Sequence, residues 1–229
     1  MRTKSLLLAA AALAAGALSS QAQTVYSANI VGYVNTVIPS GGYQLIAPSL
    51  SVTSTNSAED VLPALQNGDV ILLWSGSTYL EYTYGAPGQW QYPDGVTVGP
   101  APLLGNGKGF FYLNNSGLAE TNTQVGTVLL TNTTTLPAGQ YALVGSTPPV
   151  SDSLDGTNFN LPLINGDIVL LWNPTNQTYL NYTFGATGQW QYPDGVTIGP
   201  APVIPVGGSF FYLNESGSAE TWTNNLTVQ

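Results

Sequence analysis

The sequence predicts an all-β protein made of two tandem antiparallel β-sandwich or barrel-like modules, pseudo-symmetric and packed together. The first observation is a repeat: at an offset of 100, residues 78–121 and 178–221 are identical at 32 of 44 positions. The second is local, because short apolar or alternating segments recur about every 8–12 residues between Gly, Pro and Asn turns. Both observations indicate a duplicated antiparallel unit.

The repeat extends upstream of these segments. NGDVILLW at 67–74 matches NGDIVLLW at 165–172 at an offset of 98, so the second copy is two residues longer in the turn that follows. A hairpin turn tolerates such an insertion. We expect one module over 23–121 and a second over 122–229. No linker separates them, which favours tight packing.

The strands of each copy follow from local patterns. Residues 70–74 form an apolar run of strand length, and 78–84 alternates Tyr and Leu with polar residues as a half-buried strand does. Residues 110–113 (FFYL) follow two glycines and end at an Asn-rich turn. One short helix is expected within 57–65, with Ser57 as its N-cap and an acid three residues later.

The first 22 residues have the features of a secretory signal peptide. Arg2 and Lys4 precede an apolar run at 6–18, and small residues lead to an expected cleavage site after Ala22. The apolar run is shorter than the roughly 20 residues that a membrane span needs. We therefore expect a secreted, extracellular or cell-surface protein with no transmembrane segment in its mature chain.

The mature chain is acidic and poor in charge. Lys108 is its only cation, against twelve carboxylates, and charged residues make up 7% of the full chain. Such a chain has no means of neutralising phosphates, which excludes nucleic acid and anionic lipid surfaces as partners. Cysteine is absent, so packing rather than disulfides must stabilise the fold.

The residue types exclude most catalytic chemistry. The chain has no His and no Cys, which excludes Ser-His-Asp and Cys-His triads and zinc sites with nitrogen or sulfur ligands. Carboxylate chemistry remains, and Asp94 and Asp194 lie in identical stretches of the two copies. Pro-Asp-Gly is, however, a β-turn sequence. We expect a turn there, no catalytic residues, and a protein that is not an enzyme.

One loop suggests a cation site. Asp152, Asp155 and Asn158 bring two carboxylates and an amide into a short segment, which suits a hard cation such as Ca²⁺. The spacing is not that of an EF-hand loop, and the corresponding region of the first copy lacks these acids. A plain Asp-Gly turn is the alternative interpretation.

Aromatic residues between turns provide the ligand-binding hypothesis. The candidate residues are Trp90, Tyr92, Trp190 and Tyr192. Alternate strand residues share a face, so each Trp-Tyr pair would point the same way and stack on sugar rings if exposed. The alternative is that these rings fill the core. The aromatic residues inside apolar runs are expected in the core: Trp74, Trp172, Phe110 and Phe210.

Some segments resemble known proteins. Residues 25–35 (VYSANIVGYVN) look like the start of an uncharacterised family of secreted bacterial proteins with paired β modules. Residues 42–48, the strand ending at Trp74, and 105–112 (GNGKGFFY) are similar to a module of bacterial surface proteins, from which the second copy departs at 205–209 (PVGGS). The resemblance covers nearly the whole mature chain. It implies a secreted or surface role and supplies no catalytic residues.

Three functional hypotheses follow. The first is a secreted, non-catalytic structural or adhesive protein of the extracellular space or cell surface. The second is a carbohydrate-binding module that uses the paired aromatic residues on an extracellular glycan. The third is a self-assembling filament subunit, in which the potential strand at 25–38 pairs with a neighbouring copy.

Overall fold

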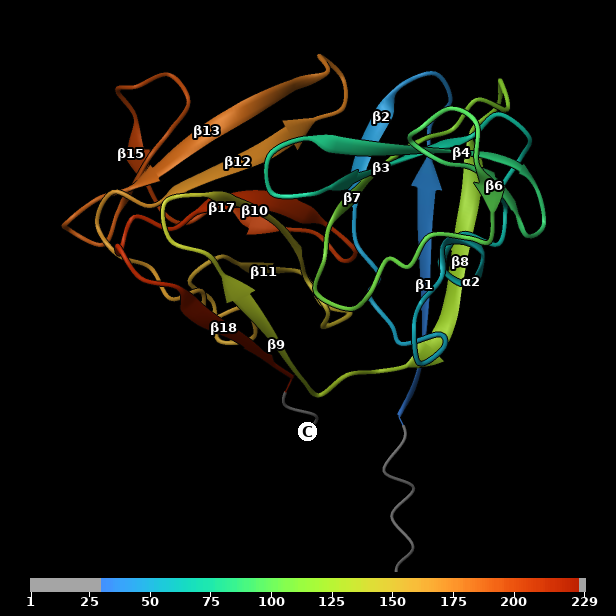
Figure 1. Ribbon diagram of the computed structural model, residues 1–229. Coiled ribbons are helices and arrows are strands. Elements are labelled where there is room, and N and C mark those ends of the chain that lie inside the picture. The colour runs from blue at the N-terminus through green and yellow to red at the C-terminus, as the bar shows by residue number, and fades with distance from the viewer. Residues whose placement is uncertain (1–29, 227–229) are drawn as a thin grey trace, which may run out of the picture. The chain divides into compact units, whose positions relative to one another are not determined.

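The computed structural model describes residues 30–226, and the expected signal peptide lies outside the described residues. Both copies belong to one compact unit that begins at Val31. Within the described residues the fold is all-β with a single short helix, as Figure 1 shows. The predicted fold class is confirmed.

The first copy forms a six-stranded antiparallel sheet and a two-stranded ribbon. Its strands are β1 (Val31–Ile38), β2 (Tyr43–Ile46), β3 (Val70–Trp74), β4 (Tyr79–Ala86), β5 (Gln89–Gln91), β6 (Val98–Gly99), β7 (Phe110–Leu113) and β8 (Glu120–Thr127). The sheet has the order β2-β7-β3-β4-β5-β6, and the ribbon pairs β1 with β8. The expected apolar run is thus a central strand, β3, hydrogen-bonded on both edges.

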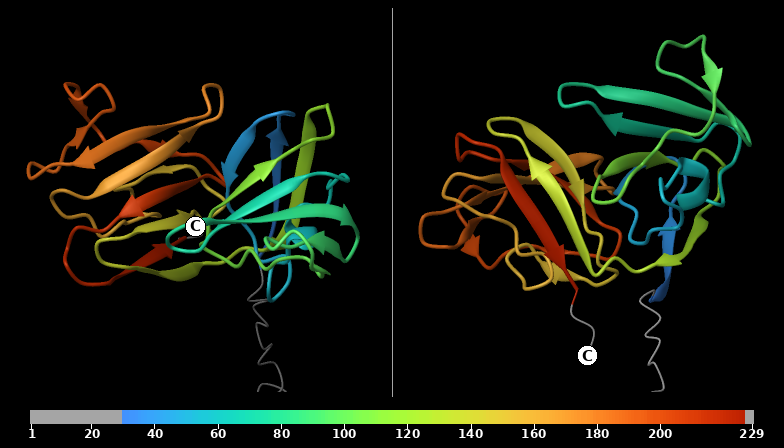
Figure 2. Two further views of the ribbon diagram at one scale, coloured as in Figure 1. Left: turned by 45° about the horizontal axis from the view of Figure 1, so that its top comes forward. Right: turned by 60° about the horizontal axis from the view of Figure 1, so that its bottom comes forward.

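The second copy repeats this arrangement. Its strands are β9 (Thr131–Leu136), β10 (Tyr141–Gly145), β11 (Asp152–Ser153), β12 (Ile168–Asn173), β13 (Thr178–Phe184), β14 (Trp190–Gln191), β15 (Ile198–Gly199), β16 (Val203–Ile204), β17 (Ser209–Leu213) and β18 (Glu220–Asn225). The sheet order β10-β17-β12-β13-β14-β15 corresponds strand for strand to that of the first copy. The views in Figure 2 show β9 and β18 side by side as the second ribbon.

Strand pairing places the junction of the copies later than the repeat suggested. Strand β8 pairs with β1 along its whole length, from Ile38 opposite Glu120 to Val31 opposite Thr127. Strand β9 then pairs with β18. The copies therefore meet at 128–130 rather than after residue 121. The obvious identity ends inside β8, where buried Asn122 and Gln124 stand in place of Trp222 and Asn224, although the backbone pairing continues.

The helix forms where a capping box was expected. Helix α2 (Ala58–Val61) begins after Ser57, whose side chain accepts a hydrogen bond from the Asp60 N–H while the Asp60 carboxylate accepts from the Ser57 N–H. Two acids in the first turn suit the positive end of the helix. Pro63 follows at once, so the helix is a single turn.

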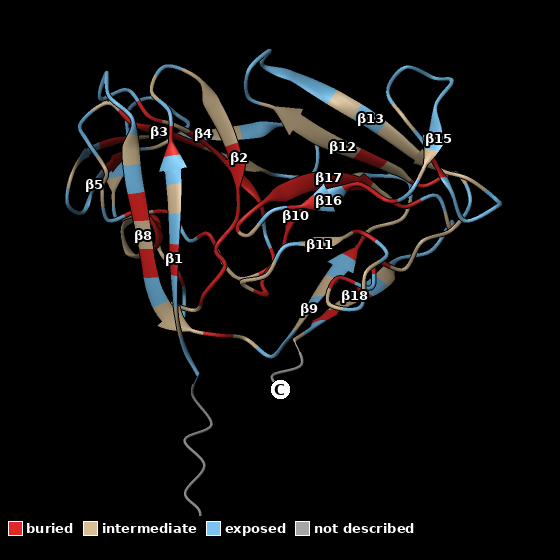
Figure 3. Cartoon of the chain, turned by 180° about the vertical axis from the view of Figure 1, so that it is seen from behind, coloured by how far each residue is buried: buried red, intermediate tan, exposed pale blue. Residues whose placement is uncertain are grey.

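Each copy has its own core, and a third cluster joins the two copies. Phe110 and Phe210 are fully buried, as expected. The shared cluster is formed by Leu45 and Phe111 of the first copy with their counterparts Leu143 and Phe211, and partly buried Trp74 and Trp172 pack against it. Figure 3 shows the buried residues of β10 and β17 at this junction. The expected packing of the copies into one body is confirmed.

Candidate binding site

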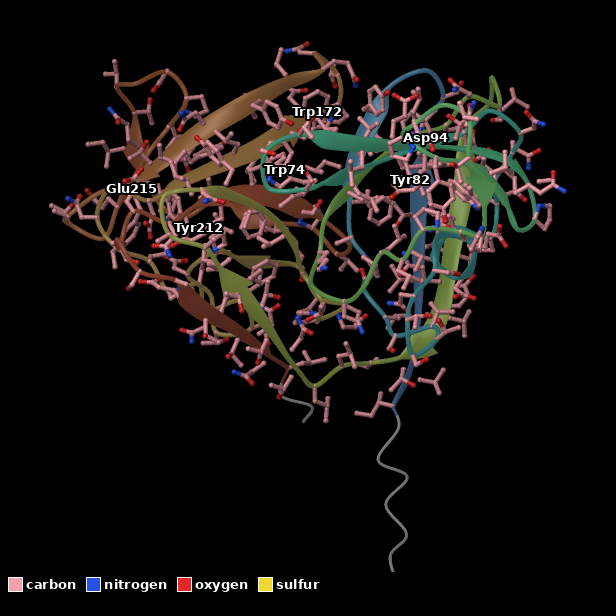
Figure 4. The ribbon with its side chains drawn as sticks, in the orientation of Figure 1. Trp74, Tyr82, Asp94, Trp172, Tyr212 and Glu215 are labelled. Carbon is pink, nitrogen blue, oxygen red and sulfur yellow. The ribbon has the colours of Figure 1, made fainter. Side chains whose placement is uncertain are left out.

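The copies meet through reciprocal contacts, as across an approximate two-fold axis. The indole N–H of Trp74 donates to the backbone oxygen of Tyr141 (2.9 Å), and that of Trp172 donates to the backbone oxygen of Tyr43 (2.7 Å). Figure 4 labels both tryptophans. The backbones also approach closely, because a Cβ on Gly145 would lie 2.1 Å from the Cβ of Ala47. A larger residue at Gly145 would push the copies apart.

The hydroxyls of Tyr79 and Tyr179 lie at the centre of this junction, 2.7 Å apart. Shallow apolar crevices of about 200 and 330 Å³ flank the pair, and both are lined largely by aromatic rings. In the larger crevice Gln177, from the two-residue insertion, bonds the backbone N–H and carbonyl of Tyr43. The tyrosine hydroxyls and indole N–H groups are bonded within the junction, so it offers few polar groups to orient a ligand.

Of the two interpretations of Trp90 and Trp190, the structure supports the one in which these rings fill the core, and they are not available as exposed stacking platforms. Both side chains have 0% exposure and belong to the cores of their copies. Trp90 packs edge-on against Tyr84 across the β4–β5 pair, with ring centroids 5.1 Å apart. A short strand between two turns carries no apolar run in the sequence, yet here it turns its large side chain inward.

Tyr92 and Tyr192 remain partly exposed. The ring of Tyr92 packs edge-to-face on Tyr82, with centroids 5.1 Å apart, and its hydroxyl donates to the backbone oxygen of Pro100 (3.0 Å). Tyr192 repeats both contacts with Tyr182 and Pro200. Each copy therefore presents a rigid corner of two tyrosine rings.

In the first copy this corner borders a pocket. The pocket has a volume of about 650 Å³, and its lining residues are Ser57, Glu59, Leu73, Tyr82, Gly88, Tyr92, Pro100, Ala101, Pro102 and Leu103. Figure 4 labels Tyr82, one of these lining residues. We call this space the Glu59 pocket. It joins two aromatic rings, a carboxylate and an aliphatic rim, and it is the candidate binding site.

Glu59 was missed in the sequence and is held firmly by the structure. Its Oε1 accepts hydrogen bonds from the indole N–H of Trp90 (2.9 Å) and from the backbone N–H of Gly88 (2.7 Å). Two donors on one oxygen fix the carboxylate and leave Oε2 for other partners. The available signal was an acid in the first turn of a capped helix, but nothing local connected it with a tryptophan 31 positions later.

In the second copy the corresponding acid does not bond the tryptophan. The bond from Ala58 to Pro102 matches that from Leu154 to Pro202, so Asp155 takes the place of Glu59, and its carboxylate accepts from the hydroxyl of Ser153. No helix follows β11, and the backbone N–H of Gly188 bonds the carbonyl of Gly185 instead. The indole nitrogen of Trp190 is buried, and no acceptor in residues 30–226 reaches it. The tyrosine corner is thus present twice, whereas in the described residues only the first copy has a carboxylate bonded to its buried tryptophan.

Asp94 and Asp194 lie in exposed turns, as the Pro-Asp-Gly sequence indicated. Oδ1 of Asp94 accepts from the backbone N–H groups of Val96 (3.0 Å) and Thr97 (2.8 Å). The hydrogen bond from the Thr97 side chain, with these backbone bonds, lowers the pKa of the Asp94 carboxyl. Asp194 makes the same contacts. Each carboxylate accepts hydrogen bonds from residues of its own exposed turn.

Two other acids are buried and structural. Oδ2 of Asp69 accepts from the hydroxyl of Tyr112 (2.7 Å) and the N–H of Gln66, and Oδ1 accepts from the N–H of Asn115. Asp167 makes the corresponding bonds in the second copy. Burial, followed by the bond to Asp69, raises the pKa of the Tyr112 hydroxyl. Each of these carboxylates connects neighbouring loops to a tyrosine of the sheet through hydrogen bonds.

The suggested calcium site is a hydrogen-bonded loop in the structure. Oδ2 of Asp152 accepts from the backbone and side-chain nitrogens of Asn158, both at 3.0 Å, while Asp155 bonds the hydroxyl of Ser153. Partial burial alone would raise the pKa of the Asp152 carboxyl, but the bonds from Asn158 and Ser153 lower it overall. Within residues 30–226, no three His, Cys, Asp or Glu side chains are grouped to hold a metal ion.

Comparisons with known proteins add no assignment. No family model matches the sequence, and neither the curated proteins nor the solved structures contain a significant match to it. In the described part of the chain, no helix has the length and apolar character needed to cross a membrane.

Proposed function

We propose that this chain is a secreted, non-catalytic adhesive protein of the extracellular space or cell surface that binds a glycan in the Glu59 pocket. The observation that carries the proposal is the meeting of the tyrosine corner with the fixed Glu59 carboxylate in one pocket of about 650 Å³. This volume is within the range typical of small-ligand sites, roughly 300–1,000 Å³.

The chemistry of the lining suits a sugar. The faces of Tyr82 and Tyr92 can contact the C–H faces of a pyranose ring, and the free oxygen of Glu59 can accept a hydrogen bond from a hydroxyl. Leu73, Leu103 and three neighbouring small or cyclic residues supply an apolar rim. A few placed polar groups on an apolar wall are the usual composition of a ligand site.

The absence of catalysis is supported by the same lining. Glycoside hydrolysis ordinarily requires two carboxyl groups that flank the scissile bond. Glu59 is the only carboxylate that lines this pocket, and the whole chain lacks His and Cys. Export is supported by the signal-peptide features of residues 1–22 and by a polar surface built largely without charge.

The test compares matched variants in the two copies. Binding to an array of neutral and charged oligosaccharides identifies a ligand, and its affinity is then measured for Tyr92→Ala and for Tyr192→Ala. We expect Tyr92→Ala to lose most of the affinity, because aromatic contacts with a ligand contribute about 1 kcal/mol or more. Tyr192→Ala should keep it. Equal affinities in all three proteins, or loss in Tyr192→Ala alone, would contradict the proposal; circular dichroism checks folding.

A second candidate function is self-assembly through the β1–β8 ribbon. Val31, Tyr33 and Val37 on the outer face of β1 are 65–69% exposed, and Val125 on β8 is 51% exposed. The matching face of β9 carries threonines instead. An exposed strand face that carries several apolar side chains is prone to associate with another copy.

Electron microscopy and sedimentation at high salt test this second function. We expect assemblies in the wild-type protein, their loss in Tyr33→Lys, and their persistence in Thr131→Lys, the corresponding position of β9. Dispersed monomers of the wild type at high salt would rule assembly out.

A further inference from the structure

We propose that the glycan held by the Glu59 pocket carries a free amino group, so that its ammonium contacts Glu59 and the tyrosine corner. This inference rests on the proposed function and specifies its ligand class. The site is a single subsite for a cationic group and lies in the first copy; in the second copy no acid bonds the corresponding tryptophan, Trp190.

The hydrogen bonding and charge of the Glu59 carboxylate favour a cationic ligand. One carboxylate oxygen accepts both fixed donors, from Trp90 and Gly88, and the other oxygen makes no hydrogen bond within residues 30–226. Lys108, the sole cation after residue 22, does not line the pocket. The pocket therefore contains an oriented negative charge with no neutralising side chain among its lining residues.

The tyrosine rings favour the same charge. An ammonium group within about 6 Å of an aromatic face is attracted by the ring quadrupole. Tyr82 and Tyr92 form a corner with an interplanar angle of 71°, so they present two ring surfaces to the pocket that Glu59 also lines. A carboxylate beside aromatic rings is a favourable environment for an amine.

The charge of the whole chain favours this class over an anionic glycan. The net charge is −9 with the signal region included, and two of the three cations lie in that region. A negative field of this kind raises the local concentration of cations and repels uronic or sulfated sugars. A neutral sugar experiences neither effect, so the amino group is the feature that Glu59 can select.

The second copy supplies an internal comparison. Tyr182 and Tyr192 reproduce the corner at the same 5.1 Å and 71°, but no acid bonds Trp190. A sugar ring could therefore stack on the tyrosine corner of either copy. Only the first copy also has a carboxylate, bonded to its buried tryptophan, that would bind an ammonium group. The expected stoichiometry for an amino sugar is one.

The experiment uses the mature protein with two oligosaccharides of equal length, a tetramer of glucosamine and a tetramer of N-acetylglucosamine. Isothermal titration calorimetry measures both at low and high salt. We expect the glucosamine tetramer to bind at least about tenfold more tightly, since a hydrogen bond to a charged group contributes more than a neutral one. Added salt should reduce this difference.

Glu59→Gln separates charge from structure. The glutamine oxygen can still accept from Trp90 and Gly88, so the fold is retained, but the charge is removed. We expect this variant to lose the preference for the amine and to keep any binding of the acetylated tetramer. Glu81→Gln, which removes an exposed acid from β4 outside the pocket lining, is the matched control and should retain the preference.

The outcomes distinguish the two proposals. Equal binding of both tetramers, or a preference that survives Glu59→Gln, overturns the amine inference and leaves glycan binding intact. A preference lost equally in Glu81→Gln also overturns it, because the effect would then be one of net charge. Failure of every oligosaccharide on the array to bind removes both proposals.

Discussion

The hydroxyl groups of Tyr79 and Tyr179, which occupy the same position in the two copies, bond each other at 2.7 Å. Their rings also pack edge-on against Phe111 and Phe211, each tyrosine touching both phenylalanines. The bond lies at the centre of an interface that resembles an isologous dimer contained within one chain. Several consequences of this pairing and of the differences between the copies can be measured.

Removing either hydroxyl should remove the same bond. We expect Tyr79→Phe and Tyr179→Phe each to lower the free energy of unfolding by about 1 kcal/mol. The double variant should cost about as much as one single variant, because the bond can be lost only once. Urea denaturation of the four proteins measures this, and fully additive losses would show that the hydroxyls act independently.

The two buried tryptophans should respond differently to the same substitution. Trp90→Phe loses the bond to Glu59, whereas Trp190→Phe removes a buried N–H that has no acceptor in the described residues. Loss of ring volume is common to both and cancels in the comparison. We expect Trp90→Phe to be more destabilising by about 1–2 kcal/mol. Equal losses in the free energy of unfolding for Trp90→Phe and Trp190→Phe would contradict this prediction and would indicate that the Trp190 indole N–H has an acceptor.

The Asp152 loop should depend on its hydrogen bonds and not on calcium. Asp152→Ala removes the acceptor of both Asn158 bonds and should lower the free energy of unfolding by about 1–2 kcal/mol. Asp155→Ala, at an exposed position, should cost little. Thermal unfolding with calcium and with a chelator should give the same values for each protein. A stabilisation by calcium that Asp152→Ala abolishes would restore the metal hypothesis.

Stability should fall at alkaline pH. Burial, followed by bonds to Asp69 and Asp167, raises the pKa of the Tyr112 and Tyr212 hydroxyls above the unfolded value of about 10. Where the folded pKa is the higher one, the contribution to stability is complete below the unfolded pKa and is lost as the pH rises above it. We expect the contribution of these two tyrosines to stability to be constant from neutral pH up to about pH 10 and to decline beyond it.

Ultraviolet absorbance of tyrosinate, followed together with circular dichroism, measures this decline. The buried pair should ionise only as the protein unfolds. Ionisation of all tyrosines in one step while the fold remains intact would contradict the prediction.

The strands and turns were largely predictable because their signals are local. The run at 70–74 became a central strand, the capping box at Ser57 began a helix, and Pro-Asp-Gly at 93–95 formed a turn. The boundary between the copies, predicted after residue 121 from the sequence repeat, was less well determined by the sequence. Backbone pairing with β1 continues in β8 after the obvious side-chain repeat ends. The Glu59 pocket was not predictable, since its ring and acid come from separate elements.

The sequence by itself determined that this is a duplicated all-β chain with almost no cations and no imidazole or thiol, because composition, periodicity and turn chemistry need no knowledge of distant contacts. Only the tertiary structure decided that Trp90 is buried, that Glu59 reaches it, and that Tyr79 meets Tyr179. The physical reason is that these relationships depend on which strand faces which core. Residues 31 or 100 positions apart meet only after the sheets have packed.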